Sequence, residues 1–236
     1  MHAFWQIVRT ELRLMGRDLT NLSFIVFFPA VMALVLGLQM PAGPSQTANA
    51  LMMLAFGPMI FGIMAFPMSL VNYRERGMLR RLQITPISPL RYLLAQALVG
   101  LLLVLLGGLV VLILSVVVLK LPLPANPLGL IASFLVGAIA FSALGALLGS
   151  RIRNTRSIQV VSILVFGAMA VVLVSSTTGQ SGLLQQIGAW VPARHLVQLI
   201  EANWLGSSFN IWPSLAVLAL LTVVSLGSAT KLFRWE

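Results

Sequence analysis

Six stretches of this chain are long, apolar and free of Asp, Glu, Lys and Arg. A helix needs about 20 mainly apolar residues to cross the hydrocarbon core of a bilayer, so each stretch is expected to form a membrane span. With 59% hydrophobic and 8% charged residues, the chain lies far from the composition of soluble domains. The sequence therefore predicts an all-α integral membrane protein, a single domain over residues 1–236, with spans at about 22–40, 50–71, 92–119, 128–150, 157–174 and 211–230.

The basic residues are distributed very unevenly between the two sides of these spans. If both termini lie on one side, that side receives thirteen of the fifteen Lys and Arg residues, and the other receives only Lys120 and Arg194. Loops rich in Lys and Arg stay in the cytoplasm, so we expect both termini to be cytoplasmic in a bacterial-type plasma membrane. The net charge of +10 then reflects topology and contact with anionic membrane lipids, and it needs no nucleic acid to explain it.

The first 20 residues predict an amphipathic helix that lies in the membrane interface. Trp5 begins a series of apolar residues at steps of three and four, whereas Arg9, Arg13 and Arg17 line a different face. Such a helix would place its apolar side chains at the acyl boundary and its arginines among the headgroups. It could serve only as an anchor, or it could also contact a cytoplasmic partner.

The segment between the last two spans, residues 175–210, is too polar for a seventh span but repeats apolar residues at helical spacing. We expect two short external helices, broken at Pro192, that re-enter the outer leaflet. Three tryptophans are expected at headgroup level, where an amphipathic ring is well solvated: Trp190, Trp204 and Trp212. His195 is more readily explained as an interfacial polar contact than as a metal ligand or proton donor.

The fourth span carries small residues at four-residue steps, among them Gly137, Gly145 and Gly149. Small residues let another helix approach closely, so helix packing is the first interpretation of this stripe. A substrate path along the same face is the alternative.

Several kinds of chemistry are excluded by what the sequence lacks. It has no GxxxxGK[ST] phosphate loop, so the chain is not expected to hydrolyse ATP by itself. Its spans contain no ionisable residue, which argues against proton-coupled transport. No carboxylate pair, metal motif or Ser-His arrangement is present for bond chemistry, and there is no cysteine. We therefore predict no enzyme activity, metal or bound cofactor, and any transport energy would come from outside the chain.

The loop between the second and third spans, residues 72–92, reads NYRERGMLRRLQITPISPLRY. Gly77 would allow a sharp change of direction after the second span. The apolar side of a short helix would be formed by Met78, Leu79 and Leu82, and its other side by Arg80, Arg81 and Gln83. Thr85 and Pro86 combine an N-cap with a proline at the first helical position, which favours a firm helix start. A basic stop-transfer loop is the alternative, but it explains only the arginines.

At this loop the sequence resembles the type-2 ABC transporter permeases, known as the ABC-2 family. In this family an acidic-basic pair, a glycine, a leucine-rich basic turn and a Thr-Pro pair follow the second span. The corresponding residues here are Glu75, Arg76, Gly77, Met78, Leu79, Arg80, Arg81, Leu82, Thr85 and Pro86. The similarity extends more weakly over the whole chain and is greatest to drug- and antibiotic-exporting members. Arg80 departs from other members, which have an acidic residue nearby.

The resemblance implies that the loop forms a cytoplasmic coupling helix, seated in a groove of a separate ATP-binding subunit. Its three apolar residues would fill the groove, and Arg80 and Arg81 would meet acidic groups at the rim. Glu75 would hold the loop through Arg74 or Arg76. Gly77, Thr85 and Pro86 would set the loop's geometry. ATP and Mg²⁺ would be bound by the partner, and two permease copies, identical or related, would form the pathway.

The expected function is therefore that of a permease subunit in an ATP-driven exporter of a hydrophobic or amphiphilic compound, such as an antibiotic, a drug or a lipid. Two alternatives stay open. The chain could export a lipid-linked polysaccharide, or it could be a channel or an immunity-type membrane protein that works without ATP.

Overall fold

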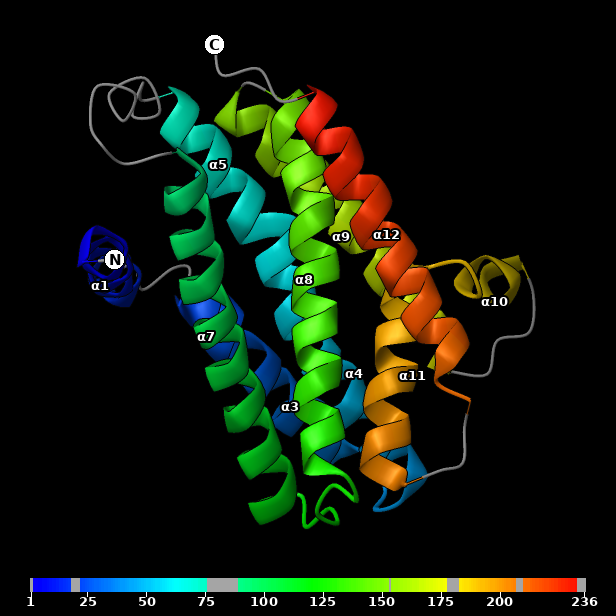
Figure 1. The fold of residues 1–236 in the computed structure, drawn as a ribbon. Helices are drawn as coiled ribbons and strands as arrows, with labels where there is room; N and C mark the ends of the chain where they lie inside the picture. The colour runs from blue at the N-terminus through cyan, green and yellow to red at the C-terminus, as the bar shows by residue number, and fades with distance from the viewer. Residues whose placement is uncertain are drawn as a thin grey trace.

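The computed structural model describes residues 2–17, 22–75, 89–152, 154–177, 183–206 and 210–232. Within these ranges every regular element is a helix and no strand occurs, which confirms the all-α prediction for this part of the chain. The long helices form one bundle in which the end of α5 (Phe66–Glu75) and the end of α12 (Trp212–Leu232) lie at the same end (Figure 1).

Prolines mark the start of several helices. Pro44, Pro127 and Pro192 are each the first residue of a helix. At this position a backbone N–H has no partner within the helix, so proline, which has no N–H, loses no hydrogen bond. In chain order the elements are α1 (His2–Arg17), η1 (Ser23–Phe27), α3 (Phe28–Gln39), α4 (Pro44–Ile60), η2 (Phe61–Ala65), α5 (Phe66–Glu75), α7 (Pro89–Val117), α8 (Pro127–Arg151), α9 (Thr155–Thr177), α10 (Leu183–Gly188), α11 (Pro192–Leu205) and α12 (Trp212–Leu232). The short elements η1 and η2 are π-helical turns within longer helices.

Five helices in the described part are long and apolar enough to cross a membrane, so the chain is a multi-pass membrane protein. They correspond to the second to sixth predicted spans, with the helices Leu94–Val117 and Trp212–Thr230 slightly shorter than the predicted ranges. The first predicted span forms a shorter apolar helix, Ser23–Gln39, of 17 residues. At about 1.5 Å per residue it is roughly 26 Å long, somewhat less than a typical hydrocarbon core. The prediction of six spans is thus confirmed for five, and the length of the first helix lies at the lower limit for a membrane span.

The continuous helix formed by α4, η2 and α5 lies at the centre of the bundle. Its apolar window is 83% buried, against 17% to 50% for the other four long helices. Pro67 has no N–H to donate to the preceding turn, and its ring clashes with an α-helical carbonyl there. The chain adapts by the π-turn η2, in which the Phe66 N–H donates to the Phe61 carbonyl, five residues back. The central helix therefore passes Pro67 without a break.

The glycines of the fourth predicted span contact two different neighbours of α8. Gly145 lies so close to the carbonyl oxygen of Gly62, in η2, that a Cβ atom would overlap it. A Cβ atom at the other two positions would press on leucine side chains of adjacent helices, Leu196 beside Gly137 and Leu70 beside Gly149. The stripe thus lets α8 approach both the central helix and α11 closely.

The segment before the last span contains two helices, α10 and α11, and Pro192 begins the second. Helix α11 runs beside α8 at the end of the bundle opposite α5 (Figure 1). The prediction for Trp204 is wrong, because this side chain is 2% exposed and packs in the core through the apolar face of α11. Trp190 and Trp212 are 85% and 74% exposed. Periodicity alone could not show that α11 inserts its tryptophan between helices.

Candidate functional site

The predicted coupling loop lies almost entirely outside the described residues. This holds for Arg76, Gly77, Met78, Leu79, Arg80, Arg81, Leu82, Thr85 and Pro86. The structure does describe the two helices that flank the loop. Helix α5 ends at Glu75 and α7 begins at Pro89, and both ends lie at the same end of the bundle (Figure 1).

Glu75, the last residue of α5, binds the first turn of α9. Its Oε1 accepts a hydrogen bond of 2.9 Å from the Thr155 backbone N–H, and its Oε2 accepts from the Thr155 hydroxyl. The first N–H groups of a helix have no partner within the helix and attract negative charge. The next N–H, of Arg156, donates to Asn154 Oδ1 at 2.8 Å. Glu75 and Asn154 thus cap α9 together, and one cap comes from 80 residues away in the chain.

The expectation that Glu75 holds the loop through Arg74 or Arg76 stays a prediction, because Arg76 lies outside the described residues. The structure adds a contact that was not expected, in which the Glu75 carboxylate binds Thr155 on another helix. The sequence missed Thr155 because a polar pair so far apart leaves no periodic signal.

Two residues earlier, α5 also contacts α1. The Tyr73 hydroxyl donates to Glu11 Oε1 at 3.4 Å, and the Glu11 side chain is only 3% exposed. Only a weak sequence signal pointed to this contact, since Glu11 is the single acidic residue of an otherwise basic helix. The last turn of α5 is therefore connected to α1 through Tyr73 and to α9 through Glu75.

Helix α1 packs against the start of α7 through a small apolar cluster in which Val8, Ala95 and Val99 are buried. It lies across the long helices and is seen nearly end-on in Figure 1. Trp5 is 61% exposed, beside the packing face. The predicted basic face is exposed as well, at Arg9, Arg13 and Arg17. Only part of the apolar surface of α1 is covered by protein, which leaves an apolar strip and a basic strip uncovered.

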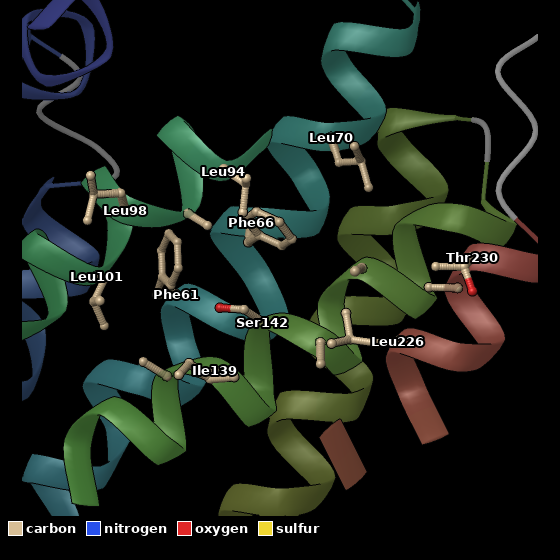
Figure 2. A pocket seen from close by; sticks show the side chains of 15 residues that line it. Phe61, Phe66, Leu70, Leu94, Leu98, Leu101, Ile139, Ser142, Leu226 and Thr230 are labelled. Atoms are coloured by element: carbon tan, nitrogen blue, oxygen red, sulfur yellow. The ribbon is translucent and has the colours of Figure 1, made fainter. Parts of the chain in front are cut away.

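A cavity of about 720 Å³ lies near the same end of the bundle. Figure 2 shows side chains of α7, including Leu94 and Leu98, on one side and Leu226 and Thr230 of α12 on the other. Phe61 of the π-turn lines it together with residues of α5 and α8. No sequence motif pointed to this cavity, because most of its described lining residues are apolar side chains of four long helices.

Comparison with protein families gives a decisive match. The family model described as ABC-2 family transporter protein matches residues 36–230, from α3 to α12. The chain belongs to the ABC-2 transporter family. No curated protein was found to match it. The match covers the central helix, the coupling loop and α9, whereas α1 precedes it.

ABC-2 proteins are in general the membrane subunits of ABC transporters, without an ATPase site of their own. In the described part of this ABC-2 chain, no group of three or more His, Cys, Asp or Glu residues is placed to hold a metal ion. What the structure shows at α1, α5 and α9 is a set of hydrogen bonds, from Tyr73 to Glu11 and between Glu75 and Thr155, that connect the three helices.

His195 of this ABC-2 chain has a structural environment. Its Nδ1 lies 3.2 Å from Ser214 Oγ, and its Nε2 lies 3.1 Å from the Ala189 carbonyl. Ser214 Oγ is in turn 3.0 Å from Gln198 Oε1. The ring thus connects α11 to the start of α12 and to the turn that follows α10.

Proposed function

We propose that this chain is the membrane-spanning permease subunit of an ATP-driven ABC exporter and works with a separately encoded ATP-binding subunit. ATP and Mg²⁺ would be bound by that partner. The observation that carries the proposal is the arrangement at the end of α5, where Tyr73 contacts α1 and Glu75 caps α9, immediately before the family's coupling signature. A loop displaced by a partner would therefore act on three helices at once.

In this proposal residues 76–88 form the coupling helix. Met78, Leu79 and Leu82 would fill a groove of the ATP-binding subunit, and Arg80 and Arg81 would meet acidic groups at its edge. ATP binding would bring two such subunits together and move two permease copies, identical or related, between inward- and outward-facing states. The shift requires that the partner bind one state more tightly than the other. Both termini would lie in the cytoplasm of a bacterial-type plasma membrane.

The proposed cargo is a hydrophobic or amphiphilic compound, such as an antibiotic, a drug or a lipid. Support comes from the spans, which carry no charged residue that could pair with an ionic cargo. A lipid-linked polysaccharide is the second candidate cargo. Sugar paths favour aromatic platforms, and the whole chain has only two tyrosines, which makes this cargo the second choice.

Co-purification tests the coupling directly. We expect the tagged wild-type chain to retain an ATP-binding subunit expressed from the same cells. Gly77→Pro, or the pair Arg80→Glu and Arg81→Glu, should abolish this association because they change the loop's turn and its charge. A pair outside the loop, Lys120→Glu and Arg194→Glu, makes the same charge change and should keep the partner.

Membrane insertion of each variant is verified by its monodisperse elution in detergent. If no ATP-binding subunit associates with the wild type, or if the loop variants retain it equally well, the loop is only a topology signal. A channel or an immunity-type protein then becomes the better explanation.

A further inference from the structure

The cavity beside the central helix has a floor of small and aromatic side chains. Ala143 on α8 and Phe61 on η2 are buried, at 3% and 1% exposure. Alanines also line it on α7 and α12, which keeps the surrounding helices from filling the space with their own side chains. The volume of about 720 Å³ falls within the range of roughly 300–1,000 Å³ that is common for ligand sites.

The lining offers almost nothing for a polar ligand to bind. Among the described residues that line the cavity, only Ser142 and Thr230 have polar side chains. The Thr230 hydroxyl already donates to the Gly227 carbonyl at 3.0 Å, within its own helix. None of these described lining residues is charged. The site therefore selects for hydrocarbon and against any group that must keep its water or a counter-ion.

The mouth of the cavity opens on the side of the bundle. Three large apolar side chains at the wall are exposed, with Leu94 at 54%, Ile139 at 53% and Leu226 at 45%. They belong to three helices that are long and apolar enough to span the membrane. In a bilayer, the medium next to this mouth is therefore lipid and not water.

We propose that this cavity binds an acyl chain of a bilayer lipid. An apolar cavity of this size stays dry, and an empty one loses the dispersion contacts of its walls. In a bilayer, the alkyl chains of lipids are present beside this mouth in molar excess over any other compound. They are apolar, as the cavity walls are. A drug-like cargo would need polar contacts for orientation, and the lining does not provide them.

The acyl chain would lie against the part of the molecule that the coupling loop moves. Phe61 and Phe66 flank the π-turn of the central helix, and both line the cavity (Figure 2). Leu70, one turn before Tyr73, lines it as well. The bound chain is therefore in contact with the segment that ends at Glu75, and it fills the space that α5 would need for a sideways movement.

Photolabelling in vesicles tests this site without an ATP-binding subunit, so its result does not depend on the proposed transport function. The chain is placed in phosphatidylcholine vesicles that contain a trace of phosphatidylcholine with a diazirine on one acyl chain. After irradiation, peptide mapping is expected to find phospholipid adducts on the buried floor, at Phe61, Phe66 and Ala143. Adducts on the exposed face of α9, at Leu164, report general contact with lipid.

Two variants fill the space, and one controls for the substitution itself. Ala143→Leu, and separately Ala146→Leu, should lower floor labelling by about tenfold or more relative to Leu164, as expected if about 1.4 kcal/mol or more of binding is lost. The control is Ala132→Leu, the same change on the exposed face of α8, which should leave labelling unchanged. If one filling variant fails to fold, the other variant and the wild-type map still decide the question.

The proposal is overturned if wild-type labelling is confined to exposed faces, or if the filling variants label the floor as strongly as the wild type. It also fails if a diazirine fatty acid reaches the floor but the phospholipid does not, which would indicate a detached alkyl compound such as cargo. A further alternative is that a second permease copy covers the mouth. Because the chain has no cysteine, the single substitution Ile139→Cys tests this without interference from other thiols. Efficient disulfide formation between two copies at this position would show that a second permease covers the mouth.

Discussion

Glu75 and Thr155 form a contact whose importance comes from its position. The carboxylate satisfies a backbone N–H that has no partner within α9, and it accepts from the side chain of the same residue. Two bonds to one residue fix the direction of the carboxylate as well as its distance. A rotation of the end of α5 would therefore be passed to the first turn of α9, and Glu75 would act as a positioning residue.

Glu75→Gln and Thr155→Val each weaken this contact with little change in shape. Gln keeps one acceptor oxygen but loses the charge that favours the N-terminus of α9, and Val removes the hydroxyl donor. We expect both variants to retain the ATP-binding subunit but to export severalfold less cargo per ATP hydrolysed. The measurement is ATP hydrolysis and transport in the same vesicles.

Glu201→Gln makes the same change at an exposed carboxylate of α11 and should transport normally. A Glu75→Gln variant with an unchanged ratio of transport to hydrolysis would show that the contact merely caps a helix. Loss of the ATP-binding subunit from that variant would instead place Glu75 in the docking surface.

Residues on one helix were easier to predict than residues that meet across helices. The spacing of Leu196, Leu199 and Ile200 indicated one apolar face of a helix, and all three are buried. Contacts such as Tyr73 with Glu11 depend on where two helices cross, and helical periodicity contains no information about crossing points. The candidate site was therefore found from its family signature, whereas its contacts with α1 and α9 came only from the structure.

Of the three glycines of α8 that were predicted to pack against other helices, Gly145 comes closest to the backbone of a neighbour, the central helix. Gly145 allows this because its missing Cβ leaves room for the Gly62 carbonyl. The fit is rigid, since the neighbouring atom is backbone and cannot rotate away. The small residues of α8 therefore set the distance between the two helices.

Gly145→Ala should force α8 and η2 apart. Overpacking of this kind costs about 1–3 kcal/mol, which corresponds to a loss of several degrees in Tm for a chain of this size. Gly227→Ala on α12 is the matched control, because nothing lies within 4 Å of the added carbon. Thermal unfolding in detergent measures both. Equal Tm values for the two variants would mean that the helices separate at no cost.

Helix length was predictable, but helix placement was not. Long uncharged runs lead to long helices because every backbone polar group in a bilayer must be satisfied within the helix. The same rule cannot show that Ser23–Gln39 falls short of the other spans, or that α11 carries Trp204 into the core. Those outcomes depend on packing partners that are distant in the sequence.

At the scale of the whole molecule, the positions of the helix ends bear on the membrane topology, that is, on which helix ends face which side of the membrane. The start of α4 and the start of α9 lie at opposite ends of the bundle (Figure 1). The distribution of basic residues predicts that the second of these is cytoplasmic, together with both termini. In that topology the short first helix would cross the membrane as well, by local thinning of the bilayer or with help from its flanking residues.

Ser45→Cys and Ser157→Cys test this arrangement, since both serines are exposed and the chain has no other cysteine. A membrane-impermeant maleimide should label Cys at 45 in intact cells and Cys at 157 only after permeabilisation. Labelling of both positions in intact cells would show that the first helix does not cross, and the reverse pattern would invert the topology.

The π-turn Phe61–Ala65 gives the central helix a phase difference between its two halves. A π-turn holds one residue more than the α-helical turn it replaces, so the side chains before and after it follow two offset registers. Deleting one residue inside this turn would remove the offset, but it would return Pro67 to an α-helical turn with whose carbonyl its ring clashes. Deleting a residue between Phe66 and Glu75 would rotate Glu75 by about 100° and carry its carboxylate away from Thr155. The position of Glu75 beside Thr155 therefore depends on the number of residues in the central helix, both within the π-turn and after it.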